Sequence, residues 1–271
     1  MSALSAGDGP ELPDYTRFSE FLRSVAGIDL SQYKRRQMER RIRSFAERRG
    51  VTSLDDYRAM VRGDDDELNA LLDRITINVS QLFRNPEQWV RLAQDVVPDL
   101  AGSGDRIRAW SAGCSYGAEA YSLAVTVREH APRSRLEIRA SDIDRRILDA
   151  AGRGEFTRDD ARSAPAEMLD RHFEPTGSGG WKARRELLSA VRFHQEDLLK
   201  ASHAPGSFDL VLCRNVVIYF TPEARSQVHE MLARSLRPGG YLVIGSTERI
   251  GQPLEELGLE PAWPFVFRKR A

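Results

Sequence analysis

Short apolar segments alternate with amphipathic helical segments over residues 104–271, and this alternation restricts the fold more than any other feature of the sequence. A helix between two strands allows the second strand to run parallel to the first in one sheet. We therefore predict an α/β fold built on a parallel sheet. The predicted strands are Ile107–Trp110, Leu136–Ala140, Val191–His194, Phe208–Cys213 and Tyr241–Gly245, and the predicted helices are Ala118–Glu129, Arg145–Ala151 and Pro222–Arg237.

The residues before this region follow a helical pattern. In Phe18–Val25, apolar residues recur at the spacing of one buried helix face. We expect residues 1–13, which are rich in Gly, Pro, Ser and Ala, to form a flexible leader. The sequence predicts an all-α domain with a linker helix over residues 14–101 and the α/β domain over residues 102–271.

One stretch of the α/β domain departs from the alternation. Residues 157–190 contain the run Thr176–Gly180, whose three glycines are typical of a hairpin tip. A small β insertion is therefore predicted at about residues 157–190.

Composition excludes several classes of protein. Forty basic and forty acidic residues give zero formal charge, which argues against a uniformly basic nucleic-acid coat. The two cysteines, Cys114 and Cys213, lack metal-ligand spacing, so we expect no structural metal and a reducing, cytoplasmic location. No apolar run approaches the ~20 residues that span a bilayer, so membrane insertion is not expected.

The turn after the first predicted strand and the acid after the second predict a nucleoside site. Gly113–Gly117 leads from strand to helix, where backbone N–H groups can approach a ligand. Asp142 follows the second strand, where a carboxylate can accept both ribose hydroxyls. A tight turn and a helix cap at Asp142 or Asp144 would explain the same residues without a ligand. Because no phosphate-binding loop is present, S-adenosylmethionine is the best candidate, with Glu119 near its amino-acid end.

Two further residues follow the strand Phe208–Cys213. Asn215 and Tyr219 come after its carboxyl end, where active sites of open α/β sheets lie. The alternative for Tyr219 is a core aromatic ring with its hydroxyl at the surface.

A basic helix is predicted in the N-terminal domain. Residues 34–49 contain eight basic and two acidic residues around a narrow apolar stripe. An ordinary solvated helix face would look similar, but a focused basic patch also suits an anionic partner, either an acidic helical protein or nucleic acid. The candidate contact residues are Lys34, Arg35, Arg36, Arg40, Arg41 and Arg43.

Four motifs in order resemble those of one family. Ile75–Arg84 is similar to T-x-N-x-T-x-F-F-R, Trp110–Ser122 to W-S-A-(A/G)-C-S-x-G-E-E-P-Y-S, Ser141–Asp144 to S-D-I-D, and Cys213–Phe220 to C-R-N-V-x-I-Y-F. These are signatures of CheR-type chemoreceptor methyltransferases. The resemblance covers nearly all of the chain from Tyr15 onward.

The resemblance implies a class I Rossmann-like S-adenosylmethionine methyltransferase sheet with a small β insertion, preceded by an all-α N-terminal domain. It implies methylation of receptor glutamates, with S-adenosylhomocysteine as product. Arg84 and Tyr219 would be the catalytic residues. The implied cofactor contacts are Asn78, Ser80, Arg84, Gly113, Glu119, Asp142, Asp197, Leu198, Asn215 and Val216.

The sequence departs from the family pattern at several of these positions. Ser80 replaces Thr, and Leu82 replaces the first Phe of a pair. Alanines flank Glu119 where the family has Glu and Pro, and Asp197 replaces Asn near the adenine. None of these changes removes a residue on which the chemistry depends.

The expected partner is the cytoplasmic helical bundle of a chemoreceptor. We expect the enzyme to be a monomer and not to bind nucleic acid. One branch of the family docks a receptor pentapeptide on the inserted subdomain. Phe173–Leu187 is about three residues shorter here, so we predict no dependence on the pentapeptide. A nucleic-acid methyltransferase and a non-catalytic cofactor-binding scaffold are the alternatives. The sequence contains no N/D-P-P-Y/W tetrapeptide, which argues against the first alternative. The second is disfavoured by Arg84, Asp142, Asn215 and Tyr219.

Overall fold

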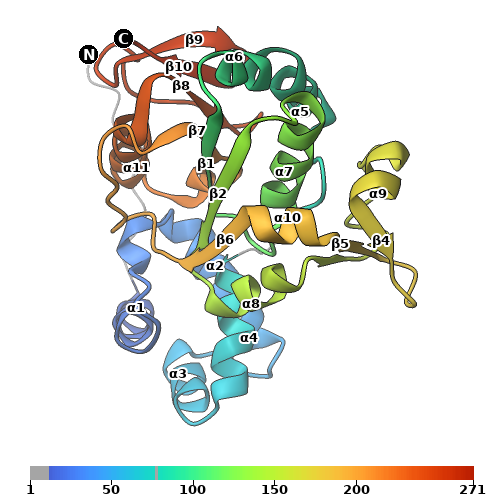
Figure 1. The fold of residues 1–271 in the computed structure, drawn as a ribbon. Coiled ribbons are helices and arrows are strands. Elements are labelled where there is room, and N and C mark those ends of the chain that lie inside the picture. Colours follow the sequence, from blue (N-terminus) through green and yellow to red (C-terminus); the bar gives the residue numbers. More distant parts are fainter. Residues whose placement is uncertain (1–11, 77–78) are drawn as a thin grey trace. The chain divides into compact units, whose positions relative to one another are not determined.

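The computed structural model describes residues 12–76 and 79–271, which fold into two compact units (Figure 1). The helical unit contains residues 12–76 together with Tyr219–Ala224. The sheet unit contains residues 79–218 and 225–271. No helix in the described part of the chain is long and apolar enough to cross a membrane.

The helical unit packs its helices around an aromatic and aliphatic core. Phe18 and Tyr57 stack with their ring centroids 5.8 Å apart, and both side chains are fully buried. Ser53 caps one helix by accepting hydrogen bonds from two backbone N–H groups. The elements are α1 (Pro13–Ala26), η1 (Leu30–Gln32), α2 (Arg35–Glu47), α3 (Leu54–Arg62) and α4 (Asp65–Thr76).

A short segment far along the chain completes this unit. Phe220 forms a β-bridge with Tyr33, and their rings meet edge to face at 5.1 Å. The Lys34 N–H donates to the Tyr219 carbonyl at 2.8 Å, and the Thr221 N–H donates to the Gln32 carbonyl at 2.9 Å. Tyr219–Ala224 is therefore bound to η1 and the start of α2 by backbone pairing as well as by ring packing.

The sheet unit is built on a seven-stranded sheet of order β6-β2-β1-β7-β8-β10-β9. The first five strands in this order are parallel, and β10 is antiparallel to both of its neighbours. The strands are β1 (Arg106–Ala112), β2 (Arg135–Asp142), β6 (Val191–Gln195), β7 (Phe208–Cys213), β8 (Leu236–Ile244), β9 (Leu259–Trp263) and β10 (Val266–Lys269). The five predicted strands and the parallel sheet are confirmed, whereas β9 and β10 were not predicted.

Helices connect the parallel strands and cover the sheet. Figure 1 shows α7 and α11 on opposite faces. The helices of this unit are α5 (Pro86–Arg91), α6 (Val97–Gly102), α7 (Ala118–His130), α8 (Arg145–Arg153) and α10 (Arg185–Ala190), with a π-helical turn η2 (Leu92–Val96). Most of α11 (Pro222–Ser235) and of the 3-10 turn η3 (Val217–Tyr219) also belongs to it, while Tyr219–Ala224 belongs to the helical unit. The predicted helix Pro222–Arg237 ends at Ser235, because β8 already begins at Leu236.

The linker region belongs to the sheet unit. Residues 86–102 form one helical stretch through α5, η2 and α6. Trp89, Leu92 and Val96 are buried in the same core as Leu123 of α7. The domain boundary was predicted at residue 101, but this packing joins residues 79–101 to the sheet.

The insertion forms a separate three-stranded antiparallel sheet. Its order is β3-β5-β4, with β3 (Glu155–Phe156), β4 (Phe173–Pro175) and β5 (Trp181–Ala183), and α9 (Ala166–His172) precedes β4. The Thr176 N–H donates to the Gly180 carbonyl at 2.9 Å, which closes the predicted hairpin tip. A Cβ on Gly180 would lie 2.3 Å from the Phe156 carbonyl oxygen, so this position requires glycine.

Candidate active site

Three neighbouring parallel strands end at one edge of the sheet. In spatial order, β2 ends at Asp142, β1 at Ala112 and β7 at Cys213. β1 is paired on one side with β2, the next strand of this sheet along the chain, and on the other side with β7, so the strand order reverses at β1. Ligands of open α/β sheets bind where strand order reverses in this way. The candidate site is therefore built on the residues that follow these three strands.

The turn after β1 contacts both neighbouring strand ends, Ser141 of β2 and Val216 after β7. The Gly113 and Cys114 N–H groups donate to the Ser141 carbonyl at 2.8 and 2.9 Å. Gly113 has a φ of +77°, and a Cβ there would lie 2.5 Å from a Val216 methyl carbon. Glycine is required both by this conformation and by this contact, because the Val216 side chain packs directly against the Gly113 backbone.

Asp142 is a buried carboxylate at this edge, with 9% of its surface exposed. It accepts hydrogen bonds from the Ser115 N–H at 2.8 Å and the Asp144 N–H at 3.1 Å, one on each oxygen. Burial raises the pKa of Asp142, against the effect of these hydrogen bonds. Each oxygen retains a lone pair for a ligand hydroxyl. Asp144 caps α8 by accepting from the Arg146 and Ile147 N–H groups, so the two acids have different roles.

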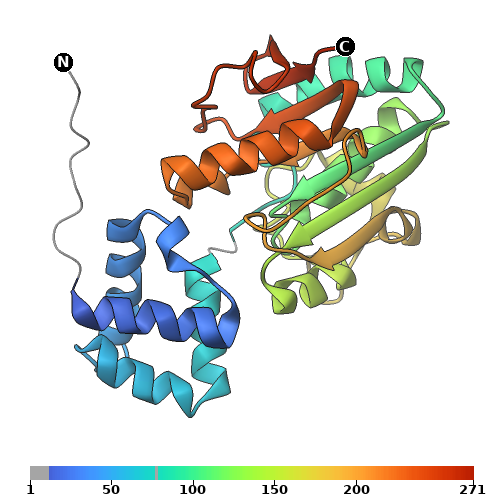
Figure 2. The ribbon, with the colours of Figure 1, turned by 90° about the vertical axis from the view of Figure 1, so that its left-hand side faces the viewer.

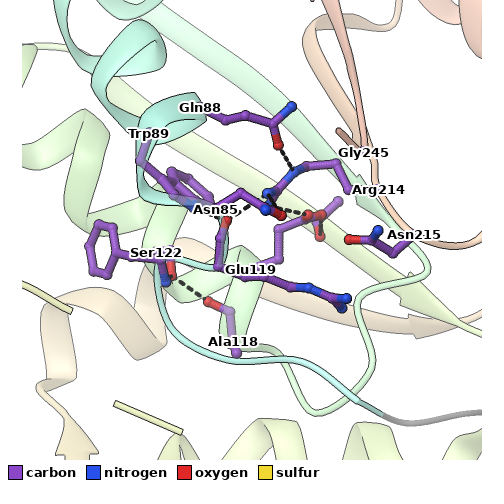
Figure 3. A network of polar contacts seen from close by, with 12 residues as sticks. Asn85, Gln88, Trp89, Ala118, Glu119, Ser122, Arg214, Asn215 and Gly245 are labelled. Carbon is purple, nitrogen blue, oxygen red and sulfur yellow. Dashed lines mark hydrogen bonds and ion pairs between the residues drawn. The ribbon is translucent and has the colours of Figure 1, made fainter. Parts of the chain in front are cut away.

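Glu119, at the start of α7, is engaged in a buried ion pair (Figure 3). One carboxylate oxygen accepts from the Ser111 hydroxyl at 2.7 Å, and the other lies 3.3 Å from Nη1 of Arg214. Burial raises the pKa of Glu119 and lowers the pKa of Arg214. Glu119 was predicted to lie near the amino-acid end of S-adenosylmethionine, and in the structure its carboxylate contacts Ser111 and Arg214.

Arg214 is a central residue of the site that was not predicted from the sequence. Its guanidinium donates to the side chains of Gln88 at 2.8 Å and Asn85 at 3.2 Å, and to the Arg84 carbonyl at 2.6 Å (Figure 3). With the bond to Glu119, it connects the segment before α5, α5, α7 and the end of β7. A charged residue directly after the apolar run Leu210–Cys213 was the available signal.

Glu248 is the second residue that was missed. It is 2% exposed and accepts the N–H groups of Asn215 at 3.0 Å, Val216 at 3.1 Å and Gly245 at 2.6 Å. Asn215 has a φ of +62°, in the left-handed region that asparagine tolerates better than most non-glycine residues. Burial raises the pKa of Glu248. This carboxylate therefore fixes the backbone of the two predicted site residues after β7.

The segment before α5 packs on the amino end of α7. The Phe83 N–H donates to the Ser122 hydroxyl at 2.8 Å, and the Ser80 carbonyl accepts from the Tyr116 hydroxyl. The Arg84 guanidinium donates to the Val79 carbonyl at 3.1 Å. Ser80 and Arg84 thus belong to the sheet unit. Asn78 lies outside the described residues.

Asp197 and Leu198 follow β6, the strand beside β2. Gln195 is in register with Asp142, and the Glu196 N–H donates to the Asp142 carbonyl at 2.8 Å. Asp197 accepts from the Leu199 N–H at 3.0 Å and pairs with Lys200 at 3.3 Å, while Leu198 is buried. These residues therefore extend the same edge of the sheet.

Tyr219 belongs to the helical unit, with the basic helix α2. The Arg41 guanidinium lies over its ring, 5.5 Å from the centroid. Burial lowers the pKa of Arg41, partly offset by Tyr219. Since Arg84 belongs to the sheet unit, the two predicted catalytic residues come from different units.

The basic residues of α2 differ in their engagement. Arg43 binds Asp14 through two bonds of 2.8 and 2.9 Å and also Glu39 at 2.8 Å. Arg35 pairs with Glu39 at 3.6 Å, and Lys34 is half-buried. Arg36 and Arg40 are exposed. Among the described residues, no cluster of three His, Cys, Asp or Glu side chains could hold a metal ion.

Two family models match the chain in succession. "CheR methyltransferase, all-alpha domain" matches residues 13–76, and "CheR methyltransferase, SAM binding domain" matches residues 78–260. A chemotaxis protein methyltransferase of Listeria innocua is 36% identical over 243 residues, covering 89% of this chain and 92% of the relative. Chemotaxis protein methyltransferase 1 of Pseudomonas aeruginosa is 33% identical over 260 residues, 92% of each chain. The chemotaxis protein methyltransferase of Vibrio anguillarum is 34% identical over 258 residues, also 92% of each.

Proposed function

This chain belongs to the CheR methyltransferase family and is an S-adenosylmethionine-dependent methyltransferase of chemotaxis, and we propose that its substrates are glutamate carboxylates of bacterial chemoreceptors. The products would be glutamyl methyl esters and S-adenosylhomocysteine. The observation that carries the proposal is the edge of the sheet at which Gly113, Asp142 and Asn215 come together. We place the reaction in the cytoplasm, since both cysteines are buried and unpaired.

The residues at this edge fit S-adenosylmethionine. Gly113 packs against Val216 and presents partly exposed backbone at this edge, and Asp142 is a buried carboxylate with free acceptor capacity for ribose hydroxyls. We assign the adenine to the surface between Asp197-Leu198 and Asn215-Val216. The remaining assigned contacts are Asn78, Ser80, Arg84 and, for the methionyl amino group, Glu119.

The proposed mechanism relies on alignment and not on proton transfer. S-adenosylmethionine supplies a methyl group on a positively charged sulfonium, and this group passes to a carboxylate oxygen as the carbon–sulfur bond breaks. A glutamate side chain with a pKa of ~4.3 is ionised at neutral pH, so no residue needs to act as a base. The Arg84 guanidinium would orient the carboxylate, and the Tyr219 hydroxyl would donate a hydrogen bond to it. Alignment of this kind lowers barriers by up to ~7–11 kcal/mol.

We assign receptor binding to the basic helix α2. Arg36 and Arg40 are its exposed arginines, and they would face the acidic side chains of a receptor helical bundle. Arg43 would instead stabilise α2 through Asp14 and Glu39. A protein partner is favoured over nucleic acid because few aromatic rings lie among these arginines for bases to stack on. The enzyme is proposed to act as a monomer.

We propose that this enzyme does not depend on a receptor pentapeptide. Docking by β-augmentation needs a sheet edge with free N–H and C=O groups. The edge strand β4 has only three residues, and its Pro175 has no N–H to donate. β3, at the other edge, has only two residues. A fluorescence titration with a C-terminal receptor pentapeptide should show no saturable binding, whereas micromolar, saturable binding would mean that the tether is used.

Transfer of a labelled methyl group tests the function directly. Incubation with labelled S-adenosylmethionine and receptor cytoplasmic fragments should label the receptor in a form that mild base releases, because methyl esters hydrolyse in base. Asp142→Ala should label much more slowly, and Asp144→Ala, which removes only a helix cap, is the matched control. Absence of label, or label that survives base, would exclude glutamate methylation.

A further inference from the structure

One face of the sheet carries charged side chains where parallel sheets are usually covered. Along β1, β2 and β6, apolar residues such as Ile107, Ile138 and Val191 point into the core that contains α7. The alternate positions hold mainly arginines, which must face the other side because side chains alternate along a strand. Parallel sheets ordinarily have apolar residues on both faces. This alternation therefore marks an uncovered face.

The missing cover is visible in the ribbon. Residues 196–207, which connect β6 to β7, contain no helix. Figure 2 shows α11 in front of the strands on the β7–β8 side, while no helix of the sheet unit lies in front of the middle of β2 and β6. The charged face of β1, β2 and β6 is therefore open.

A cavity of about 580 Å³ lies on this face. Its polar lining includes Arg108, Arg135, Glu137, Arg139, Arg192 and His194. Such a volume lies within the ~300–1,000 Å³ that is typical of small-molecule sites. The lining comes from β1, the first five residues of β2, the start of β7, the end of α10 and β6. None of these lining residues is among those assigned to the candidate active site, so the cavity is a separate one.

The positive charge of this face is only partly neutralised. Asp209, 5% exposed, is shared between Arg108 at 3.1 Å and Arg237 at 2.5 Å. Arg135 pairs with Glu137 at 3.0 Å, and Arg139 pairs with Glu196 at 3.2 Å. Within the described part of the chain, Arg192 has no carboxylate at ion-pair distance.

Arg139 and Arg192 are directly in register on adjacent strands. Guanidinium groups held side by side repel each other unless an anion lies between them. All of the cations that line the cavity are arginines, whose planar donors match phosphate oxygens in pairs. We infer that this cavity is a binding site for a small molecule that carries two or more phosphate groups, such as a nucleoside di- or triphosphate.

Calorimetric titration of the intact protein with ATP and with inorganic tripolyphosphate tests this site. Saturating S-adenosylhomocysteine is added to occupy the cofactor site, so that neither probe can bind there and contribute to the measured heat. Both probes should bind, and Arg192→Gln and Arg139→Gln should each weaken binding about tenfold through loss of a charge-assisted contact. Arg162→Gln is the matched control, because Arg162 is an exposed arginine of the insertion that forms an ion pair with Asp159. The affinity of the Arg162→Gln variant for both probes should match that of the wild type.

Three results would overturn the inference. Neither probe binding at millimolar concentration would exclude a phosphate site. Equal affinity in the wild type, Arg192→Gln and Arg139→Gln would place the probes elsewhere. Much tighter binding of a single-stranded oligonucleotide than of ATP, lost in the same two variants, would assign the face to nucleic acid. Arg192 is exposed, so Arg192→Gln keeps the test valid even if Arg139→Gln, which removes the arginine partner of Glu196, folds poorly.

Discussion

Replacing Arg214 with methionine should destabilise the sheet unit strongly, because it isolates a buried carboxylate. The Arg214 side chain is 3% exposed and that of Glu119 is 10% exposed. Without the guanidinium, Glu119 keeps only the Ser111 hydroxyl, and Gln88, Asn85 and the Arg84 carbonyl each lose a donor. Breaking one side of a buried ion pair costs about 3–5 kcal/mol. We expect a loss in unfolding free energy of this size.

The loss should depend on pH. Burial already raises the pKa of Glu119, and Arg214 opposes that effect, so its removal should raise this pKa further. A carboxyl group whose pKa is higher in the folded than in the unfolded state takes up a proton on folding. Stability of the Arg214→Met variant should therefore fall as pH rises from the unfolded pKa of Glu119 through its folded value. The deficit relative to wild type should be larger at pH 8 than at pH 5.5.

Urea unfolding followed by tryptophan fluorescence measures this quantity selectively. All four tryptophans, Trp89, Trp110, Trp181 and Trp263, lie in the sheet unit. Adding Glu119→Gln to the methionine variant should restore more than about 1 kcal/mol, because the uncompensated charge is gone. Arg171→Met, which breaks an exposed ion pair, is the control and should cost less than about 1 kcal/mol. A deficit below 1 kcal/mol, or one that does not change with pH, would refute the reasoning.

Three further predictions concern the active site and its partner. Asp142→Ala should weaken S-adenosylmethionine binding by roughly 1.5–3 kcal/mol in calorimetry, and Asp144→Ala should leave this affinity unchanged. Equal affinity in both variants would remove Asp142 from the site. Arg84→Ala and Tyr219→Phe should lower turnover at saturating cofactor while the thermal unfolding midpoint stays near that of wild type, and wild-type rates in both would end their assignment. Arg40→Glu should weaken receptor binding and reduce its salt dependence without changing cofactor affinity, because exposed charges act over a screening length of ~8 Å at physiological ionic strength. If receptor binding by the wild type is insensitive to salt, α2 is an ordinary solvated helix face.

The sequence predicted the parts of the fold that depend on local patterns. Strand length, helix periodicity and the glycine turn are encoded within a few neighbouring residues, and the ends of parallel strands must share an edge. β9 and β10 were missed because they are short and their side chains do not alternate clearly, and β9 contains Pro261. A proline within a run argues against a strand unless it lies at a sheet edge, as β9 does.

The partners of the candidate site could not be predicted in the same way. Arg214 is 95 residues from Glu119 along the chain, and no local pattern shows that the two charges meet. Glu248 acts on the backbone N–H groups of Asn215 and Val216, which carry no sequence signature. The assignment of Tyr219 to the helical unit likewise depends on backbone hydrogen bonds with residues 32–34.

The placement of Tyr219–Ala224 has a consequence for how this protein can be recombined. The helical unit is made of two stretches that are more than 140 residues apart in the gene product. A hybrid joined at residue 77 alone would combine the η1–α2 corner of one parent with the 219–224 strap of the other. The ring pair Tyr33–Phe220 and the contact of Arg41 with Tyr219 would then be mixed. Functional hybrids should need three crossover points, so that both stretches are inherited from the same parent.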